Sequence, residues 1–162
     1  MKKLVIIRHA KSDWEDSSLD DYDRPLNKRG LCDAPFMGEY LHDKGLKPDL
    51  IMSSPAVRAV NTAELIAKEI NYDKIISPNQ YIYEAFVNTL QDIVSFIHDD
   101  NDTVFLVGHN PGVSALAYTL CDLKENLPTC AIVEIDFECD SWMEVSKGNS
   151  TLVSYDFPKK LK

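Results

Sequence analysis

The sequence contains no long apolar run and no basic excess. No apolar stretch approaches the roughly 20 residues that a membrane-spanning helix needs, and the four apolar residues Leu4–Ile7 end at Arg8. That run is too short for the apolar region of a signal peptide. We therefore expect no membrane contact and a cytoplasmic location.

The sequence also lacks paired cysteines. Its four cysteines, at positions 32, 121, 130 and 139, form no C-x-x-C motif, so free thiols in a reducing compartment are the expectation. The histidines at 9, 42, 98 and 109 show no metal-ligand spacing relative to these cysteines. The sequence thus predicts neither a bound metal nor a cofactor.

Acidic residues outnumber basic ones by 26 to 17, for a net charge of −9. This charge argues against nucleic acid as a partner, because phosphate backbones require a basic face. Six of the acids lie within residues 13–23. A solvated loop is the simplest interpretation of this segment, and a role in selecting substrate stays open.

Repeats, low-complexity stretches and linkers are absent as well. The length of 162 residues suits one domain with a sizeable core, covering residues 1–162. Nothing in the pattern requires a dimer, so a monomer is the expectation.

Hydrophobic periodicity predicts strands that alternate with helices. The predicted strands lie at 3–8, 49–53, 74–77 and 103–109, and the predicted helices begin within 27–34, at 54, at 89 and at 110. The tail predicts three further strands joined by hairpins, at 131–137, 141–146 and 150–157. This order indicates an α/β protein with three α/β/α layers, in which a mostly parallel central sheet has an antiparallel edge.

Several polar residues and prolines mark the predicted helix starts. Asn27 and Ser54 are expected as N-caps, and so is Asn110, which precedes Pro111. Pro35 falls inside the first helical pattern and predicts a late start or a kink there.

Cationic and protonatable side chains follow three of the predicted parallel strands. The first strand ends in Arg8 and His9, the second is followed by a helix with Arg58 in its first turn, and a third ends before His109. The carboxyl ends of parallel strands meet at one edge of a sheet. Two arginines, two histidines and two helix N-termini gathered there favour a phosphoryl oxyanion.

Other phosphate chemistries lack their motifs in this sequence. It has no G-x-x-x-x-G-K-[ST] loop, no cysteine followed six positions later by arginine, and no clustered Asp and His ligands for two metals. Metal-free chemistry remains, with a neutral histidine as nucleophile.

Four segments, VIIRHAKS, SSPAVRAVNTAELIA, YEAFVNTL and LVGHNPGVS, resemble the histidine phosphatase superfamily, which has the phosphoglycerate mutase-like fold. The resemblance runs in order from residue 4 to about residue 120. The short length, the RHAKS opening and RPLNKRG at 24–30 are similar to the SixA-type phosphohistidine phosphatase branch. Ala10 departs from the usual Arg-His-Gly opening.

The resemblance implies catalytic roles for five residues. His9 would be the nucleophile that becomes a phosphohistidine, while Arg8, Arg58 and His109 would hold the phosphoryl oxygens. Glu84 matches the position of the family's proton donor. For His9 to attack, it must be neutral, and a main-chain carbonyl is expected to hold its other ring nitrogen.

Two further residues are predicted to bind substrate. Ser12 lies in the loop after the histidine motif, and Asn110 would donate through its backbone N–H. The function expected is a metal-independent phosphohydrolase that acts on a phosphorylated protein carrying phosphohistidine. The alternatives are a phosphatase of small phosphoesters and, less favoured, a non-catalytic phosphate-binding module. A mutase is disfavoured because the chain has few insertions to exclude water.

Overall fold

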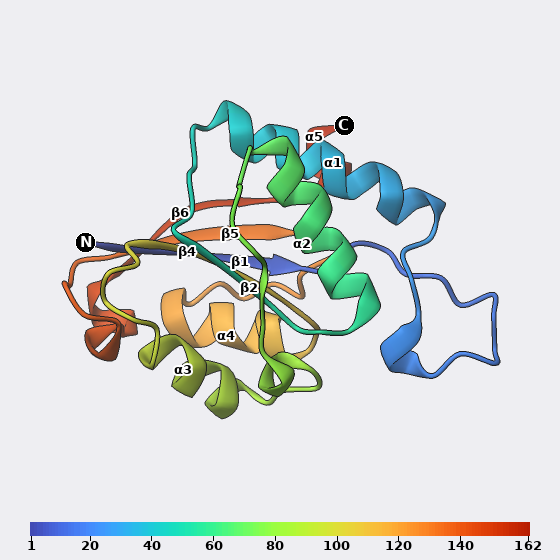
Figure 1. Cartoon of the computed structure of the whole chain (residues 1–162). Helices are drawn as coiled ribbons and strands as arrows, with labels where there is room; N and C mark the ends of the chain where they lie inside the picture. Colours follow the sequence, from blue (N-terminus) through green and yellow to red (C-terminus); the bar gives the residue numbers. More distant parts are fainter.

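The computed structural model describes all 162 residues and has a six-stranded sheet at its centre (Figure 1). The strands are β1 (Lys2–Arg8), β2 (Leu50–Ser53), β3 (Ser77–Pro78), β4 (Thr103–Gly108), β5 (Ile132–Phe137) and β6 (Ser150–Asp156), in the order β3-β2-β4-β1-β5-β6. The pairs β3–β2, β2–β4 and β4–β1 are parallel, whereas β5 runs antiparallel to both β1 and β6. The predicted fold class is confirmed.

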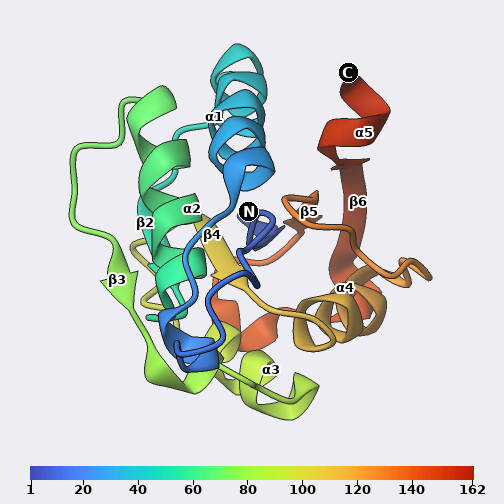
Figure 2. The same cartoon turned by 90° about the vertical axis from the view of Figure 1, so that its right-hand side faces the viewer.

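Helices cover both faces of this sheet (Figures 1 and 2). One face carries α1 (Lys28–Asp43) and α2 (Val57–Glu69), and the other carries α3 (Val87–Ser95) and α4 (Gly112–Cys121). The short α5 (Pro158–Leu161) ends the chain, and the 3-10 turns are η1 (Asp21–Asp23), η2 (Gln80–Ile82), η3 (Trp142–Glu144) and η4 (Lys147–Asn149).

The apolar run of β1 contributes to two separate cores. Leu4 and Ile6 pack in the cluster that includes residues of α3 and α4, while Val5 and Ile7 pack in the cluster beneath α1 and α2. Successive side chains of a strand point to opposite faces, so a strand covered on both faces must be apolar throughout. This burial fixes β1 rigidly at the centre of the sheet.

Helix α1 begins where Asn27 predicts, because the Asn27 side chain accepts a hydrogen bond from the backbone N–H of Gly30. The late start predicted from Pro35 is wrong, since the helix runs from Lys28 through Pro35. Proline removes the bond to the carbonyl four residues earlier, here that of Leu31. Leu31 is exposed, so water can satisfy that carbonyl.

The other two predicted caps are displaced. Helix α2 begins at Val57, and Ser54 lies ahead of it, with its hydroxyl accepting from the Ala56 N–H at 3.2 Å. Helix α4 begins at Gly112, one residue after Pro111, although the Asn110 side chain still accepts from the N–H of Ser114 at 3.3 Å. Both chain segments turn sharply before their helices.

Three element predictions differ from the structure. The strand predicted at 141–146 is wrong: Trp142 lies in η3, fully buried, and its indole N–H donates to the Asn101 carbonyl. The strand predicted at 74–77 shrinks to Ser77–Pro78, and the helix predicted at 89–98 occupies Val87–Ser95. None of the helices has the length and hydropathy of a membrane-spanning segment.

Candidate active site

Three strand ends meet at the carboxyl edge of the parallel strands. The backbone N–H of His9 donates to the Gly108 carbonyl, and that of Ser54 donates to the Val107 carbonyl, both at 3.0 Å. The rings of His9 and His109 lie 5.1 Å apart between centroids. The sheet therefore brings together two histidines that are 100 positions apart in the sequence.

His9 is buried, with 7% of its surface exposed. Its Nδ1 lies 2.7 Å from the Ala10 carbonyl oxygen; a carbonyl can only accept, so Nδ1 carries the proton and Nε2 has a free lone pair. The backbone N–H of Ala10 donates to the hydroxyl of Thr62 in α2 at 2.9 Å, which holds Ala10 against this helix. The expected main-chain acceptor for the histidine is thus confirmed.

The charge state of His9 also suits attack. Burial, together with the nearby guanidinium groups of Arg58, Arg8 and Arg24, lowers its pKa to about 4, although the hydrogen bond to Ala10 acts in the opposite direction. His9 is consequently neutral at pH 7.

His109 is held by the residue that was predicted to cap α2. Its Nε2 lies 2.7 Å from the Ser54 hydroxyl oxygen. A hydroxyl has one proton to donate and two lone pairs that can accept. When the Ser54 hydroxyl accepts from Ala56 N–H and donates its own proton to Nε2, the ring proton lies on Nδ1. Burial and the proximity of His9 and Arg58 lower the pKa of His109 to about 3.

The two predicted arginines are anchored by different partners. Nη1 of Arg8 donates to the Leu127 carbonyl at 2.8 Å. Nη1 and Nη2 of Arg58 donate to the backbone carbonyl and the carboxylate of Asp21, at 2.6 and 2.9 Å. The Nε atoms of both arginines and Nδ1 of His109 are buried without a hydrogen-bond partner. Buried N–H donors are costly to leave unpaired, so these three are suited to bind an oxyanion.

Arg24 is a third arginine at the site, and sequence reasoning missed it. It is buried, and its Nη1 donates to the Ser12 hydroxyl at 2.7 Å. The Trp14 ring covers its guanidinium at 3.4 Å. Arg24 begins the RPLNKRG segment, but it lies 15 residues after His9, and no strand end marks it. Ser12 accordingly holds Arg24 through its hydroxyl.

Among the acids of the 13–23 loop, Asp21 is the one whose carboxylate pairs with arginines. Its carboxylate accepts from Arg58, from Arg24 at 3.0 and 3.1 Å, and from the Tyr83 hydroxyl at 2.6 Å. Partial burial acts to raise its pKa, but the hydrogen bonds from Tyr83 and Arg58 outweigh it and hold the pKa well below the usual range. Burial and Asp21 together raise the pKa of Tyr83 to about 12. A wholly solvated loop is therefore too simple a description of residues 13–23.

Glu84 and Asn110 lie at the edge of this arrangement. Glu84 is exposed, has a positive φ of 54°, and makes no hydrogen bond or ion pair. The Asn110 side chain donates to the Leu127 carbonyl at 2.9 Å, the same oxygen that holds Arg8. The backbone N–H of Asn110 makes no hydrogen bond within the chain and is available as a donor.

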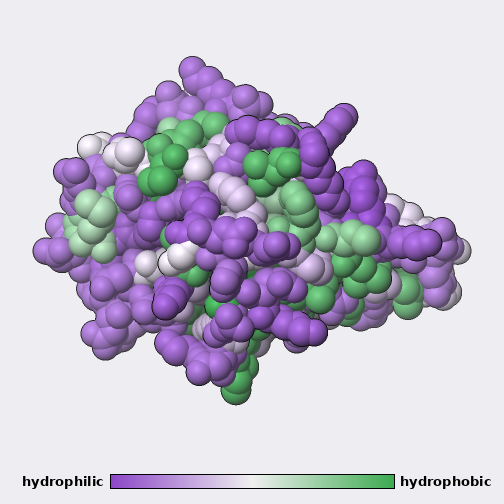
Figure 3. All heavy atoms as spheres, turned by 90° about the horizontal axis from the view of Figure 1, so that it is seen from above, coloured by the Kyte–Doolittle hydropathy of each residue, from purple (hydrophilic) through white to green (hydrophobic).

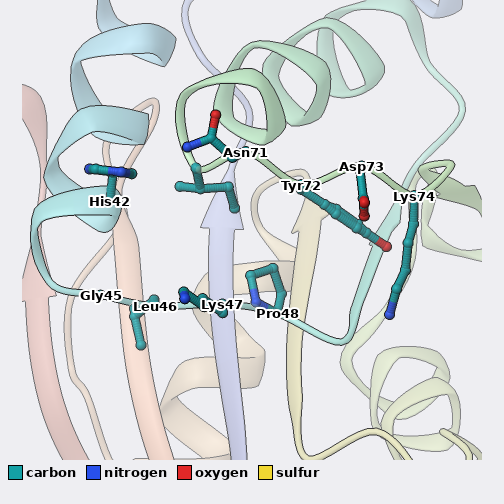
Figure 4. A pocket seen from close by; sticks show the side chains of 10 residues that line it. His42, Gly45, Leu46, Lys47, Pro48, Asn71, Tyr72, Asp73 and Lys74 are labelled. Carbon is teal, nitrogen blue, oxygen red and sulfur yellow. The ribbon is translucent and has the colours of Figure 1, made fainter.

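Another pocket lies at the opposite edge of the sheet (Figure 4). The segments that follow α1 and α2, residues 45–48 and 71–74, line it. It is at the amino ends of the parallel strands and includes neither His9 nor His109. No group of three or more His, Cys, Asp or Glu side chains is arranged to hold a metal ion.

Comparisons with known proteins show what this chain is similar to. The sequence profile of the histidine phosphatase superfamily (branch 1) matches residues 4–80. An uncharacterized chloroplastic protein of Arabidopsis thaliana is 32% identical over 154 residues, covering 88% of this chain and 70% of that protein.

Two solved structures superpose over nearly the whole chain. A protein of Agrobacterium tumefaciens, described as a candidate phosphohistidine phosphatase SixA, has a TM-score of 0.84 and 25% identity over 97% of this chain and 98% of its own. The protein histidine phosphatase SixA complexed with tungstate has a TM-score of 0.83 and 21% identity, with 99% of each chain covered.

Proposed function

This chain belongs to the histidine phosphatase superfamily and is a phosphatase, and from that premise we propose that it hydrolyses phosphohistidine in proteins through a phosphohistidine intermediate on His9. One observation carries the proposal: a neutral, buried His9 lies beside three buried N–H groups that have no partner, on Arg8, Arg58 and His109. Such donors match the oxygens of a phosphoryl group and its transition state.

The proposed reaction has two displacements at phosphorus. In the first, Nε2 of His9 forms a bond to phosphorus while the bond to the leaving group breaks. The imidazolium produced keeps its proton on Nδ1, where it donates to the Ala10 carbonyl oxygen. In the second, water bonds to phosphorus as the P–Nε2 bond breaks, which releases inorganic phosphate and restores neutral His9. No metal ion takes part in either displacement.

The lack of a proton-donating acid beside His9 supports phosphohistidine as the substrate class. His109, with a pKa of about 3, is neutral at pH 7, and Asp21 stays charged. A phosphorylated imidazole can take its proton from water, so it departs without an acid from the enzyme. An alkoxide requires such an acid, and Glu84 is the predicted donor for an ester substrate. The solved SixA structure, a protein histidine phosphatase with tungstate bound, supports the same class.

The surroundings of the site support a macromolecular substrate. Trp14 and Tyr22, on the loop beside the site, are 67% and 39% exposed. Figure 3 shows apolar atoms among hydrophilic ones on the face seen from above, including the end where this loop projects. We propose that the backbone N–H of Asn110 binds the phosphoryl group and that Ser12 contributes through Arg24.

A trapping experiment tests the proposal. The protein is incubated with a histidine-phosphorylated peptide and, in parallel, with a small phosphoester, then quenched in base. We expect acid-labile phosphate on His9, and a His9→Asn variant that loses at least about 1,000-fold in kcat. His98→Asn, at an exposed histidine outside the site, is the matched control and should retain activity.

The same experiment separates the alternatives. Turnover of the small ester in preference to the peptide would favour a small-molecule phosphatase. Phosphate binding without turnover of either compound would indicate a binding module. Undiminished turnover by His9→Asn would contradict the nucleophile assignment.

A further inference from the structure

Asp21 occupies the groups that a substrate anion needs. Its backbone carbonyl and carboxylate take both terminal nitrogens of Arg58, and the other carboxylate oxygen takes Nε and Nη2 of Arg24. Among the three guanidinium nitrogens of Arg58, Nε alone has no hydrogen-bond partner. One carboxylate of this chain thus already neutralises part of the positive charge of Arg58 and Arg24.

Contacts from several elements hold Asp21 in place. The turn η1, which begins with Asp21, lies against α2 (Figure 2) and belongs to the loop that projects from the molecule in Figure 1. Tyr83 donates its hydroxyl to the carboxylate and packs its ring edge-on against both Tyr22 and His109, at centroid distances of 5.3 and 5.4 Å. Asp23, two residues later in the same turn, is exposed and makes no side-chain contact of this kind.

We infer that Asp21 is a specificity-determining residue that competes with the phosphoryl group of the substrate for Arg58 and Arg24. A phosphoryl dianion and a carboxylate on the same guanidinium would repel each other at short range. A free oxyanion or small phosphoester must therefore displace Asp21 with its phosphoryl contacts alone. A phosphoprotein displaces it with the help of contacts outside the phosphoryl site.

The displacement is physically accessible because Asp21 lies at the surface. Its side chain is 44% exposed, so water can solvate the carboxylate once it leaves, whereas the side chains of Arg58 and Arg24 are only 7% exposed. The substrate preference rests on the proposed function, whereas the competition for the arginines does not.

Tungstate binding tests the competition without any turnover. The affinity of the full chain for tungstate is measured by titration calorimetry for the unmodified protein, Asp21→Asn and Asp23→Asn. Each variant removes one negative charge from η1, but only Asp21 contacts the arginines. We expect Asp21→Asn to bind tungstate about five-fold more tightly, the size of effect expected from one partly exposed ion pair, and Asp23→Asn to stay within about two-fold of the unmodified protein.

Three results would overturn the inference. Weaker binding by Asp21→Asn would mean that the carboxylate positions the arginines for the anion instead of competing with it. Equal tightening by both variants would reduce the effect to net charge. Tyr83→Phe, which removes one hydrogen bond to Asp21 and no charge, should also tighten binding, and unchanged or weaker binding by it would contradict the inference even if Asp21→Asn failed to fold. An absence of phosphatase activity would count against the proposed function, but it would not change what the tungstate affinities say about Asp21.

Discussion

The chemistry of the site depends on where two buried imidazole rings carry their protons. The Ala10 carbonyl fixes the proton of His9 on Nδ1, and the Ser54 hydroxyl favours a proton on Nδ1 of His109. One ring is thereby prepared to attack phosphorus and the other to donate to an oxygen. Neither role requires a charge on the histidine in the resting enzyme.

Replacing Ser54 by alanine tests how far catalysis depends on the position of the His109 ring proton. Ser54→Ala removes the hydroxyl beside Nε2 of His109, so the ring loses the contact that selects its tautomer, and we expect kcat to fall about ten-fold. Ser53→Ala is the matched control, because its hydroxyl is equally buried but donates to the Ser54 carbonyl.

The nitrogen NMR shifts of His109 provide the decisive measurement for this variant. We expect the proton to lie on Nδ1 in the unmodified protein and to be shared between both nitrogens in Ser54→Ala. A fall in kcat with an unchanged tautomer would show that Ser54 acts on the fold and not on the ring.

At the scale of the elements, the start of α1 supports the loop that follows His9. The Lys11 carbonyl accepts from the Asn27 N–H at 2.9 Å. A Cβ on Gly30 would lie only 2.2 Å from this same carbonyl oxygen. Glycine is therefore required at Gly30 for the helix to approach the catalytic loop this closely.

The substitution Gly30→Ala has two opposing effects on the stability of the protein. Alanine favours a helix over glycine by about 1 kcal/mol, but a contact of 2.2 Å with backbone forces the helix and loop apart, at a cost of about 1–3 kcal/mol. We expect the clash to dominate, with a lower free energy of unfolding in urea and a lower kcat.

Gly148→Ala is the control for that experiment. Its added Cβ would meet nothing closer than the Ser146 hydroxyl at 3.6 Å, so its stability should change little. If Gly30→Ala proved as stable and as active as Gly148→Ala, the close approach of α1 would not matter to the site.

On the scale of the whole molecule, folding keeps two histidines neutral that would titrate near pH 6.5 in the unfolded chain. In the folded protein the pKa values are about 4 for His9 and about 3 for His109. The unfolded chain therefore binds more protons than the native protein below about pH 6.5.

This difference in bound protons determines how the stability of the folded protein changes with pH. The histidine contribution to stability is fully present above about pH 6.5 and is lost as the pH falls from there toward the folded pKa of about 4. We expect the free energy of unfolding, measured in urea at pH 7 and pH 5, to decrease on acidification. A His9→Asn/His109→Asn variant should lose less than the unmodified protein between these pH values. An equal loss in both would show that the two histidines do not carry the effect.

From the sequence alone, the central strands β1 and β4 and the residues at their carboxyl ends could be predicted. Strands covered on both faces must be apolar along their length, so β1 and β4 are visible as runs that end in Arg8-His9 and Gly108-His109. Because parallel strands end at one edge, the meeting of both histidines could be predicted from these runs.

Tertiary packing brought Ser54 and Asp21 to this site, in addition to the arginines that the sequence predicts there. Serine is a residue type that favours helix caps, but the Ser54 hydroxyl contacts His109. Asp21 is one of six acids in the loop, but it contacts Arg58, which lies 37 positions away in the sequence. Local propensity describes only which backbone conformation a residue type favours among its neighbours in the chain. These contacts depend instead on where the loop and η1 pack against α2. That packing is set by hydrogen bonds and burial between segments far apart in the sequence, so no local pattern predicts it.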